Sequence, residues 1–205
     1  MSEESDKVWE NFLNPEVTRN RLISAGLFIA AYELFEDRII DRIKDFFCTG
    51  FNENGDVIHA DYQTKVLSLN KSRLRASLQW LMDANVIDDI DLEIFWRING
   101  YRHKFAHELF AIIGSEGLPV DYENRFLEMV ALFRKIEVWW ILNVDVPTNP
   151  DFYGEEIKES DIQPGPLVGI QLLLEVALGD EERSTYYYKR FLKDKWTGNP
   201  GESAS

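Results

Sequence analysis

The sequence predicts an all-α protein. Apolar residues recur at spacings of three and four through most of the chain, strand-like alternation is absent, and capping residues stand where the helical patterns begin. The chain has 205 residues, 45% of them hydrophobic and 13% aromatic, which is enough for one domain with a buried core. We therefore expect an antiparallel four-helix bundle with mostly short connections, followed by a helical tail.

The first predicted helix starts at Asn14-Pro15-Glu16 and ends near Phe47. Asn is a good cap, Pro suits the first turn, and Glu favours the positive end of the helix dipole. We expect residues 1–13 to be flexible. The polar stretch FNENGDVIHADYQ that follows the helix contains Asn-Gly, which indicates an exposed loop.

Three further helices complete the predicted bundle, which covers residues 14–143. They run over about 71–85, from the cap Asp88-Asp89 to about 113, and over about 122–142, with a turn at 114–119. On a helical wheel, the core face of the third helix consists of Ile94, Ile98, Tyr101, Phe105, Leu109 and Ile112.

The remainder of the chain differs in composition. Residues 144–196 begin with a linker rich in Pro, Gly and acidic residues, followed by helices over 167–178 and 181–196 that we expect to pack on the bundle. The run Tyr186-Tyr187-Tyr188-Lys189-Arg190 could stack on bases, but we favour docking of this segment on the bundle. Residues 197–205 are predicted to be disordered.

The charge balance opposes non-specific binding of nucleic acid. Thirty-six acidic and 22 basic residues give a net charge of −14, which repels phosphate. RNA recognition would need a local basic pocket, to which Arg73 and Arg75 could add.

The single cysteine, Cys48, excludes an intramolecular disulfide and a thiolate zinc cluster. Because no apolar run suits a membrane span and MSEESDKVWE is no secretory signal, we expect a soluble, cytoplasmic protein.

The stretch GYRHKFAHEL holds two of the three histidines in the chain. His103 and His107 are four residues apart, so they share one face of the third helix, opposite its core face. Trp96, Asn99 and Phe110 lie on the same face. Exposed helices rarely gather large aromatic residues, so this pattern predicts a face covered by another subunit or by the C-terminal segment.

Three interpretations of this stretch stay open on the residues alone. The two histidines are ordinary surface residues, or they hold zinc with a third ligand from elsewhere, although the HExxH pattern is absent. In the third interpretation they transfer protons, because imidazole exchanges a proton near neutral pH. Arg102 beside them is a planar cation suited to phosphate, and an Arg and a His suffice to cleave RNA without metal.

The segment Arg102-His103-Lys104-Phe105-Ala106-His107 resembles the RNxFAH signature of HEPN (higher eukaryotes and prokaryotes nucleotide-binding) domains, with His103 in place of Asn. The resemblance covers about residues 15–143. It implies an all-α bundle and a homodimer in which two motifs face each other. Arg102 and His107 would be the catalytic pair, assisted by His103, with neither metal nor cofactor.

Many members of the HEPN family are ribonucleases of toxin–antitoxin or phage-defence systems, and others bind nucleotides or act as scaffolds. The resemblance therefore implies an RNA substrate and a cognate antitoxin or regulatory protein, or else an inactive module that binds a protein or a nucleotide. Glu33 and Asp37 lie four apart on the first helix. They could hold Arg102 or orient an imidazole, or they could belong to a solvated charged face.

Overall fold

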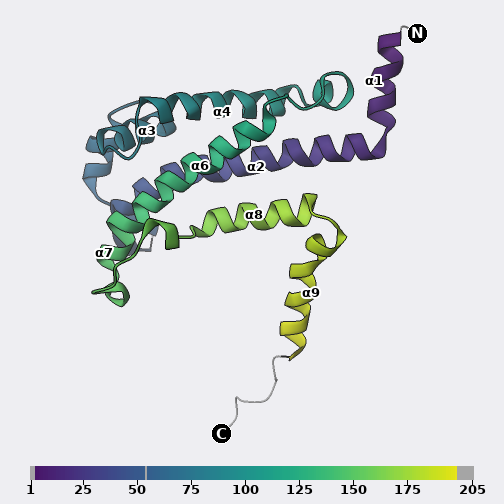
Figure 1. The fold of residues 1–205 in the computed structure, drawn as a ribbon. Coiled ribbons are helices and arrows are strands. Elements are labelled where there is room, and N and C mark those ends of the chain that lie inside the picture. The colour runs from purple at the N-terminus through teal and green to yellow at the C-terminus, as the bar shows by residue number, and fades with distance from the viewer. Residues whose placement is uncertain (1–2, 54, 198–205) are drawn as a thin grey trace.

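The computed structural model describes residues 3–53 and 55–197, and within them the chain is mostly helical, as the sequence predicts (Figure 1). Of the end predicted to be disordered, 198–205 lie outside the described residues. No described helix is long and apolar enough to span a bilayer. The helices are α1 (Glu3–Leu13), α2 (Pro15–Phe46), α3 (Arg73–Asp83), α4 (Asp89–His107), α5 (Leu109–Ala111), α6 (Tyr122–Trp140), α7 (Val146–Thr148), α8 (Gly165–Leu178) and α9 (Glu181–Thr197).

Short elements connect these helices. They are strands β1 (Cys48–Asn52) and β2 (Gly55–Ile58), π-helical turns at Tyr62–Leu67, Ile112–Glu116 and Ile141–Asp145, and 3-10 turns at Pro150–Phe152 and Glu159–Asp161.

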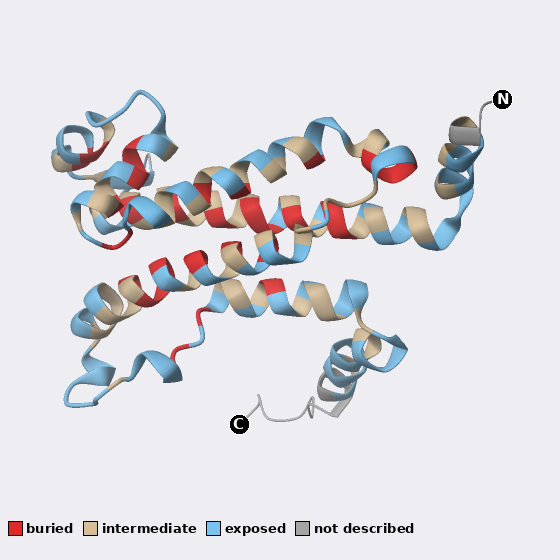
Figure 2. Cartoon of the chain, turned by 45° about the horizontal axis from the view of Figure 1, so that its top comes forward, coloured by how far each residue is buried: buried red, intermediate tan, exposed pale blue. Residues whose placement is uncertain are grey.

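Helix α2 is central, because α3, α4, α6 and α8 all pack against it. Helices α4 and α6 also pack on each other, and Figure 2 shows buried residues running along these three helices. The centre of their shared core is aromatic: Phe28, Phe35, Phe95, Phe105 and Phe133 are at most 1% exposed. Burial of each such ring stabilises the fold by about 1.5–3 kcal/mol.

Of the N-terminal segment that we predicted to be flexible, the residues from Glu3 to Leu13 form helix α1. The predicted cap of α2 is confirmed, since the side-chain oxygen of Asn14 accepts two backbone N–H groups of the first turn. Before it, α1 packs on the π-helical turn that follows α4 and α5. Asn11 Nδ2 donates to the carbonyl oxygen of Gly114 at 3.1 Å, and Val8 fits against Gly114 so closely that a Cβ there would lie 3.1 Å from it.

The predicted loop after α2 is in fact a β-hairpin. Strands β1 and β2 pair antiparallel, with Asn52 opposite Gly55. Gly55 has φ +104°, a backbone conformation that favours glycine. The Asn-Gly dipeptide is therefore better interpreted as a hairpin signal than as a loop signal. The hairpin stays on the surface, where Phe51 is 82% exposed.

Helix α4 ends at His107, six residues before the predicted end. At Glu108 the backbone adopts φ −115° and ψ 19°, which interrupts the helix before α5 begins. Contacts from distant residues hold the chain after this break. Arg21 Nη1 donates to the carbonyl oxygen of Ile113 at 2.6 Å, and α1 covers the same turn. Long-range packing has therefore overridden the local helical pattern.

The predicted core face of α4 is correct only in part. Ile98, Phe105 and Ile112 are fully buried, whereas Ile94, Tyr101 and Leu109 are half-buried. Phe95, which the prediction omitted, is also fully buried. The reason is that α4 packs against both α2 and α6, so its buried stripe is wider than the predicted one.

The two C-terminal helices behave differently from each other. Helix α8 packs on α2 and α6, as predicted. Helix α9 packs on α8 and extends away from the other long helices in Figure 1. Tyr186 and Tyr188 are 50% and 65% exposed, so the predicted docking of these tyrosines on the bundle is wrong.

Candidate functional site

Arg102 is anchored by a carboxylate from the neighbouring helix. Glu33 on α2 accepts a hydrogen bond at Oε1 from Arg102 Nε, at 2.7 Å, and the same oxygen forms an ion pair with Arg102 Nη2 at 2.6 Å. Both side chains keep contact with water, with 44% of Glu33 and 29% of Arg102 exposed. Guanidinium has five N–H groups, so Arg102 retains donors on Nη1 and Nη2 for a further ligand.

A buried tyrosine lies beneath this ion pair. Tyr32 is 0% exposed, and the Arg102 guanidinium lies 6.0 Å from the centre of its ring. Its hydroxyl accepts a hydrogen bond from Asn99 Nδ2. Burial raises the pKa of Tyr32 well above its ordinary value, so this hydroxyl stays neutral. The Tyr32 ring, whose hydroxyl is hydrogen-bonded to Asn99, therefore forms the buried surface beneath the Arg102 guanidinium.

His103 and His107 form a parallel pair on the surface of α4. Their ring centres lie 6.0 Å apart with an angle of 8° between the planes, and both side chains are exposed. His107 is the last residue of the helix. The pair therefore offers two imidazoles to solvent within one helical turn of each other and next to Arg102.

The remainder of the predicted dimer face is only partly open. Phe110 is 79% exposed. Trp96, by contrast, is half-buried by its own chain, because the guanidinium of Arg75 lies 4.6 Å from its ring centre. The C-terminal segment does not cover this face, since α8 packs on α2 and α6.

The cations around the site are neutralised within one copy of the chain. Lys104 Nζ lies 3.1 Å from a carboxylate oxygen of Glu116, whose hydrogen bond raises the pKa of the lysine. Arg97 similarly lies 3.7 Å from Glu128. A single copy thus lacks the strong local basic pocket that RNA binding would need. Asp37 is exposed on α2, and within the described part of the chain it forms no hydrogen bond or ion pair with the motif.

Neither a metal site in the described residues nor a similar known protein helps to assign a function to these residues. Among the described residues, no group of three His, Cys, Asp or Glu side chains is placed to hold a metal ion. Comparison with known proteins finds no family model, curated protein or solved structure that matches the chain. An apolar groove between α6 and α8 shares no residue with the motif. The site is therefore argued from its own geometry.

The structure brings together Glu33, Asn99, Arg102, His103 and His107, and it leaves Asp37 apart. Sequence reasoning missed Tyr32. A tyrosine on the buried side of a helix normally needs a hydrogen-bond partner, which is a signal that could have linked it to Asn99 on the facing helix.

Proposed function

We propose that this chain is a metal-independent endoribonuclease of the HEPN type that acts as a homodimer in the cytoplasm. One observation carries the proposal: two exposed, parallel imidazoles lie beside an arginine whose position is fixed by Glu33 and Tyr32. In this proposal, α2, α3, α4 and α6 are the four helices of an antiparallel bundle.

The proposed reaction uses the 2′-hydroxyl of the RNA as its nucleophile. His107 takes the 2′-hydroxyl proton, the 2′-oxygen bonds to phosphorus, and the bond to the 5′-oxygen breaks. The same imidazole of the second copy donates a proton to the leaving 5′-oxygen. The remaining N–H groups of Arg102 bind the phosphate oxygens, on which negative charge accumulates. His103 assists by hydrogen bonding, and the products carry 2′,3′-cyclic phosphate and 5′-hydroxyl ends.

A dimer supplies what one copy lacks. The two histidines of one copy lie on the same side of the scissile phosphate, whereas acid and base must act on opposite oxygens. The exposed Phe110 offers an apolar anchor, and Gly26 and Gly100 leave space for close approach of a second chain. Two copies also place two arginines near one phosphate, which offsets the acidity of the chain.

A second candidate function is supported by a specific observation. Because Glu33 already neutralises Arg102 and the net charge is −14, the same face also suits a basic protein partner. The chain would then be a catalytically silent module that binds a basic protein partner such as an antitoxin or regulator.

The decisive experiment is an RNA cleavage assay in excess chelator. Purified wild-type protein should cut a labelled single-stranded RNA and leave 2′,3′-cyclic phosphate ends. His107→Ala should reduce the rate on the order of 10²–10⁴-fold, because general acid–base help is lost. The matched control is His59→Ala, since His59 is the third histidine, is 56% exposed and lies in the connection after the hairpin.

The outcomes separate the candidates. His103→Asn should be the mildest motif variant, because Asn keeps a polar hydrogen-bonding group. If chelator abolishes cleavage, the activity depends on a metal ion, and both histidines would then be its ligands. Equal cleavage by wild type and His107→Ala would show the motif to be structural and favour the binding module.

A further inference from the structure

Helix α8 is apolar around almost its whole circumference, yet it is poorly covered. Its sequence, GPLVGIQLLLEVAL, contains one charged residue, Glu175. Ile170 is its one buried residue, while Leu173 and Val176 are 53% and 50% exposed. A helix that is hydrophobic all round is normally buried. Among the described residues, much of the outer surface of α8 therefore stays uncovered, although α9 packs on part of the helix.

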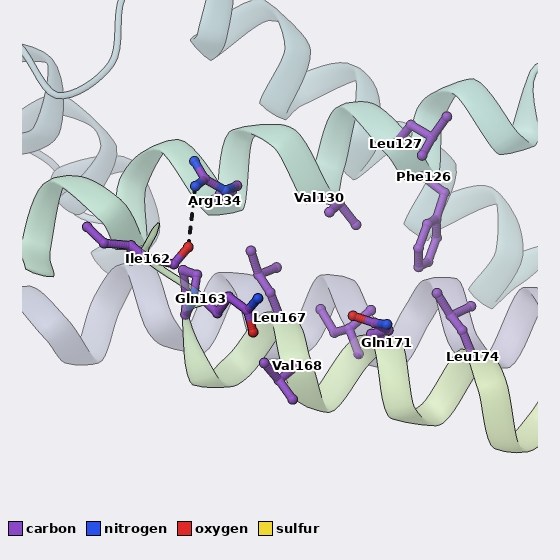
Figure 3. A pocket seen from close by; sticks show the side chains of 12 residues that line it. Phe126, Leu127, Val130, Arg134, Ile162, Gln163, Leu167, Val168, Gln171 and Leu174 are labelled. Atoms are coloured by element: carbon purple, nitrogen blue, oxygen red, sulfur yellow. Dashed lines mark hydrogen bonds between the residues drawn. The ribbon is translucent and has the colours of Figure 1, made fainter. Parts of the chain in front are cut away.

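A groove of about 420 Å³ runs between α8 and α6 beside this surface (Figure 3). Its walls are mainly apolar: Phe126, Leu127, Val130 and Arg134 come from α6, and Leu167, Val168, Gln171 and Leu174 come from α8. A second hollow shares Phe126, Leu127 and Leu174 with the groove and is also lined by the exposed carboxylate of Glu123. A long apolar groove between two helices suits the apolar face of an amphipathic helix.

Helix α9 has such a face. Tyr188 and Phe191 lie on one side of the helix and are 65% and 62% exposed, whereas the hydroxyl of Tyr187 donates to Glu175 of α8 in the same chain. From Arg183 to Lys193 the chain has four basic residues and no acidic one, although its net charge is −14. Helix α9 is thus positive, and it complements both the acidic remainder of the chain and the Glu123 carboxylate of the adjoining hollow.

Within one copy, α9 does not fill the groove. It follows α8 after a two-residue turn and extends away from α2 and α6 (Figure 1). The turn is shaped by Gly179, because a Cβ there would lie 2.2 Å from the carbonyl oxygen of Glu175. In the part of the chain that the structure describes, the groove and the side of α9 that bears Tyr188 and Phe191 are therefore both largely exposed.

We propose that two copies of this chain exchange their C-terminal helices, so that α9 of each copy lies in the α6–α8 groove of the other. The exchange buries the aromatic face of α9 and the outer face of α8 together. It is reciprocal, as expected for a twofold dimer, because each copy donates and receives the same helix. The contact uses no residue of the α4 motif and is independent of the proposed ribonuclease activity.

The test uses the full-length chain with substitutions at exposed positions, which the fold tolerates. Leu127→Glu, 64% exposed in the native chain, places a charge in the groove, and Phe191→Glu, 62% exposed, places one on the α9 face. In sedimentation experiments each variant should weaken one association step by at least about tenfold, the loss typical of a buried anchor. Phe51→Glu, at an 82% exposed aromatic of the hairpin, is the matched control and should associate like wild type.

Mixing the two variants identifies the occupant of the groove. The intact α9 of Leu127→Glu fits the intact groove of Phe191→Glu, so an equimolar mixture should regain association that neither variant has alone. A mixture that stays dissociated would overturn the exchange and favour α8 packing on α8. A wild-type chain that stays monomeric, or association unaffected by both variants, would also overturn it. Phe110→Glu, on the α4 face, should leave this step unchanged.

Discussion

Helix α2 makes an Arg–Glu pair with each of two neighbouring helices, in different surroundings. Towards α6, Arg38 contacts both carboxylate oxygens of Glu137, at 3.2 and 3.0 Å, and Glu137 is 3% exposed. Towards α4, Glu33 contacts Arg102 through one oxygen, and 44% of Glu33 is exposed. Because Glu137 is buried, the Arg38–Glu137 pair has a structural role and stabilises the packing of α2 against α6. Water reaches the second pair, so its arginine can exchange or share partners with a ligand.

Glu137→Ala is expected to have the largest effect. It leaves the charge of Arg38 without a partner at the contact of α2 and α6, and such a loss typically costs about 3–5 kcal/mol of unfolding free energy. Arg38 is 30% exposed, so we expect about 3 kcal/mol in urea denaturation. The control is Glu159→Ala, whose partner is Arg134 and whose side chain is 68% exposed. It should cost less than about 1 kcal/mol. If both variants lost the same unfolding free energy, burial of the Arg38–Glu137 pair would not make it more stabilising than an exposed pair.

Arg102→Lys should show the opposite profile, with a large loss of activity and little loss of stability. An ammonium cannot contact Glu33 and phosphate oxygens in the forked geometry of guanidinium, so cleavage should fall on the order of 10²–10³-fold. The unfolding free energy should change by less than about 1 kcal/mol. Arg97→Lys on the same helix is the control, because Arg97 is 49% exposed and paired with Glu128. A stability loss as large as that of Glu137→Ala would make the Arg102 pair structural.

Glu33→Gln should have a smaller and mixed effect. Removal of the carboxylate frees Arg102 for phosphate, so RNA should bind more tightly, and the salt dependence should steepen by about 0.7 per added contact. The weaker anchor should lower the turnover rate, which gives a split between KM and kcat. Binding and single-turnover assays at several salt concentrations measure both effects. If affinity falls together with turnover, Glu33 does not compete with phosphate.

The smallest expected effect is on thermal stability, and it concerns the hydrogen bond between the neutral Tyr101 hydroxyl and Asp121. Tyr101 donates to the Asp121 carboxylate, and this hydrogen bond lowers the pKa of that carboxyl below its ordinary value. The pair therefore stabilises the fold above the unfolded pKa of about 3.9, and the contribution is lost as pH falls through the lower folded pKa. Melting temperatures of wild type and Tyr101→Phe should differ slightly at pH 7 and converge below that range. A constant gap across pH would contradict this linkage.

The sequence predicted local features of the fold well. The predicted caps at Asn14 and Asp88 both exist, because a cap depends on residues only two or three positions apart. The predicted helices over residues 71–85 and 122–142 match α3 and α6 within two residues at each end. His103 and His107 were also placed together on the face of the helix opposite its core, since helical spacing alone determines which residues share a face.

What the sequence did not predict depends on distant contacts. Neither Gly nor Pro marks the break after His107, which is accompanied by contacts from Arg21 and from α1. The partner of Arg102 stayed open between Glu33 and Asp37, because either carboxylate could face α4 until the register of the two helices was known. The exposure of α9 was missed for the same reason, since an aromatic helix usually finds a covering surface in its own chain.

The contact between α1 and the turn after His107 also has a consequence for synthesis of the chain. Asn11 is separated by 103 residues from the carbonyl group that it binds. At translation rates of about 5–20 residues per second, α1 leaves the ribosome roughly 5–20 s before that carbonyl group is made. Throughout this interval Val8 has no partner, and the end of α4 cannot acquire its final shape. The histidine pair therefore reaches its mature arrangement late in translation, after most of α2 has had time to fold.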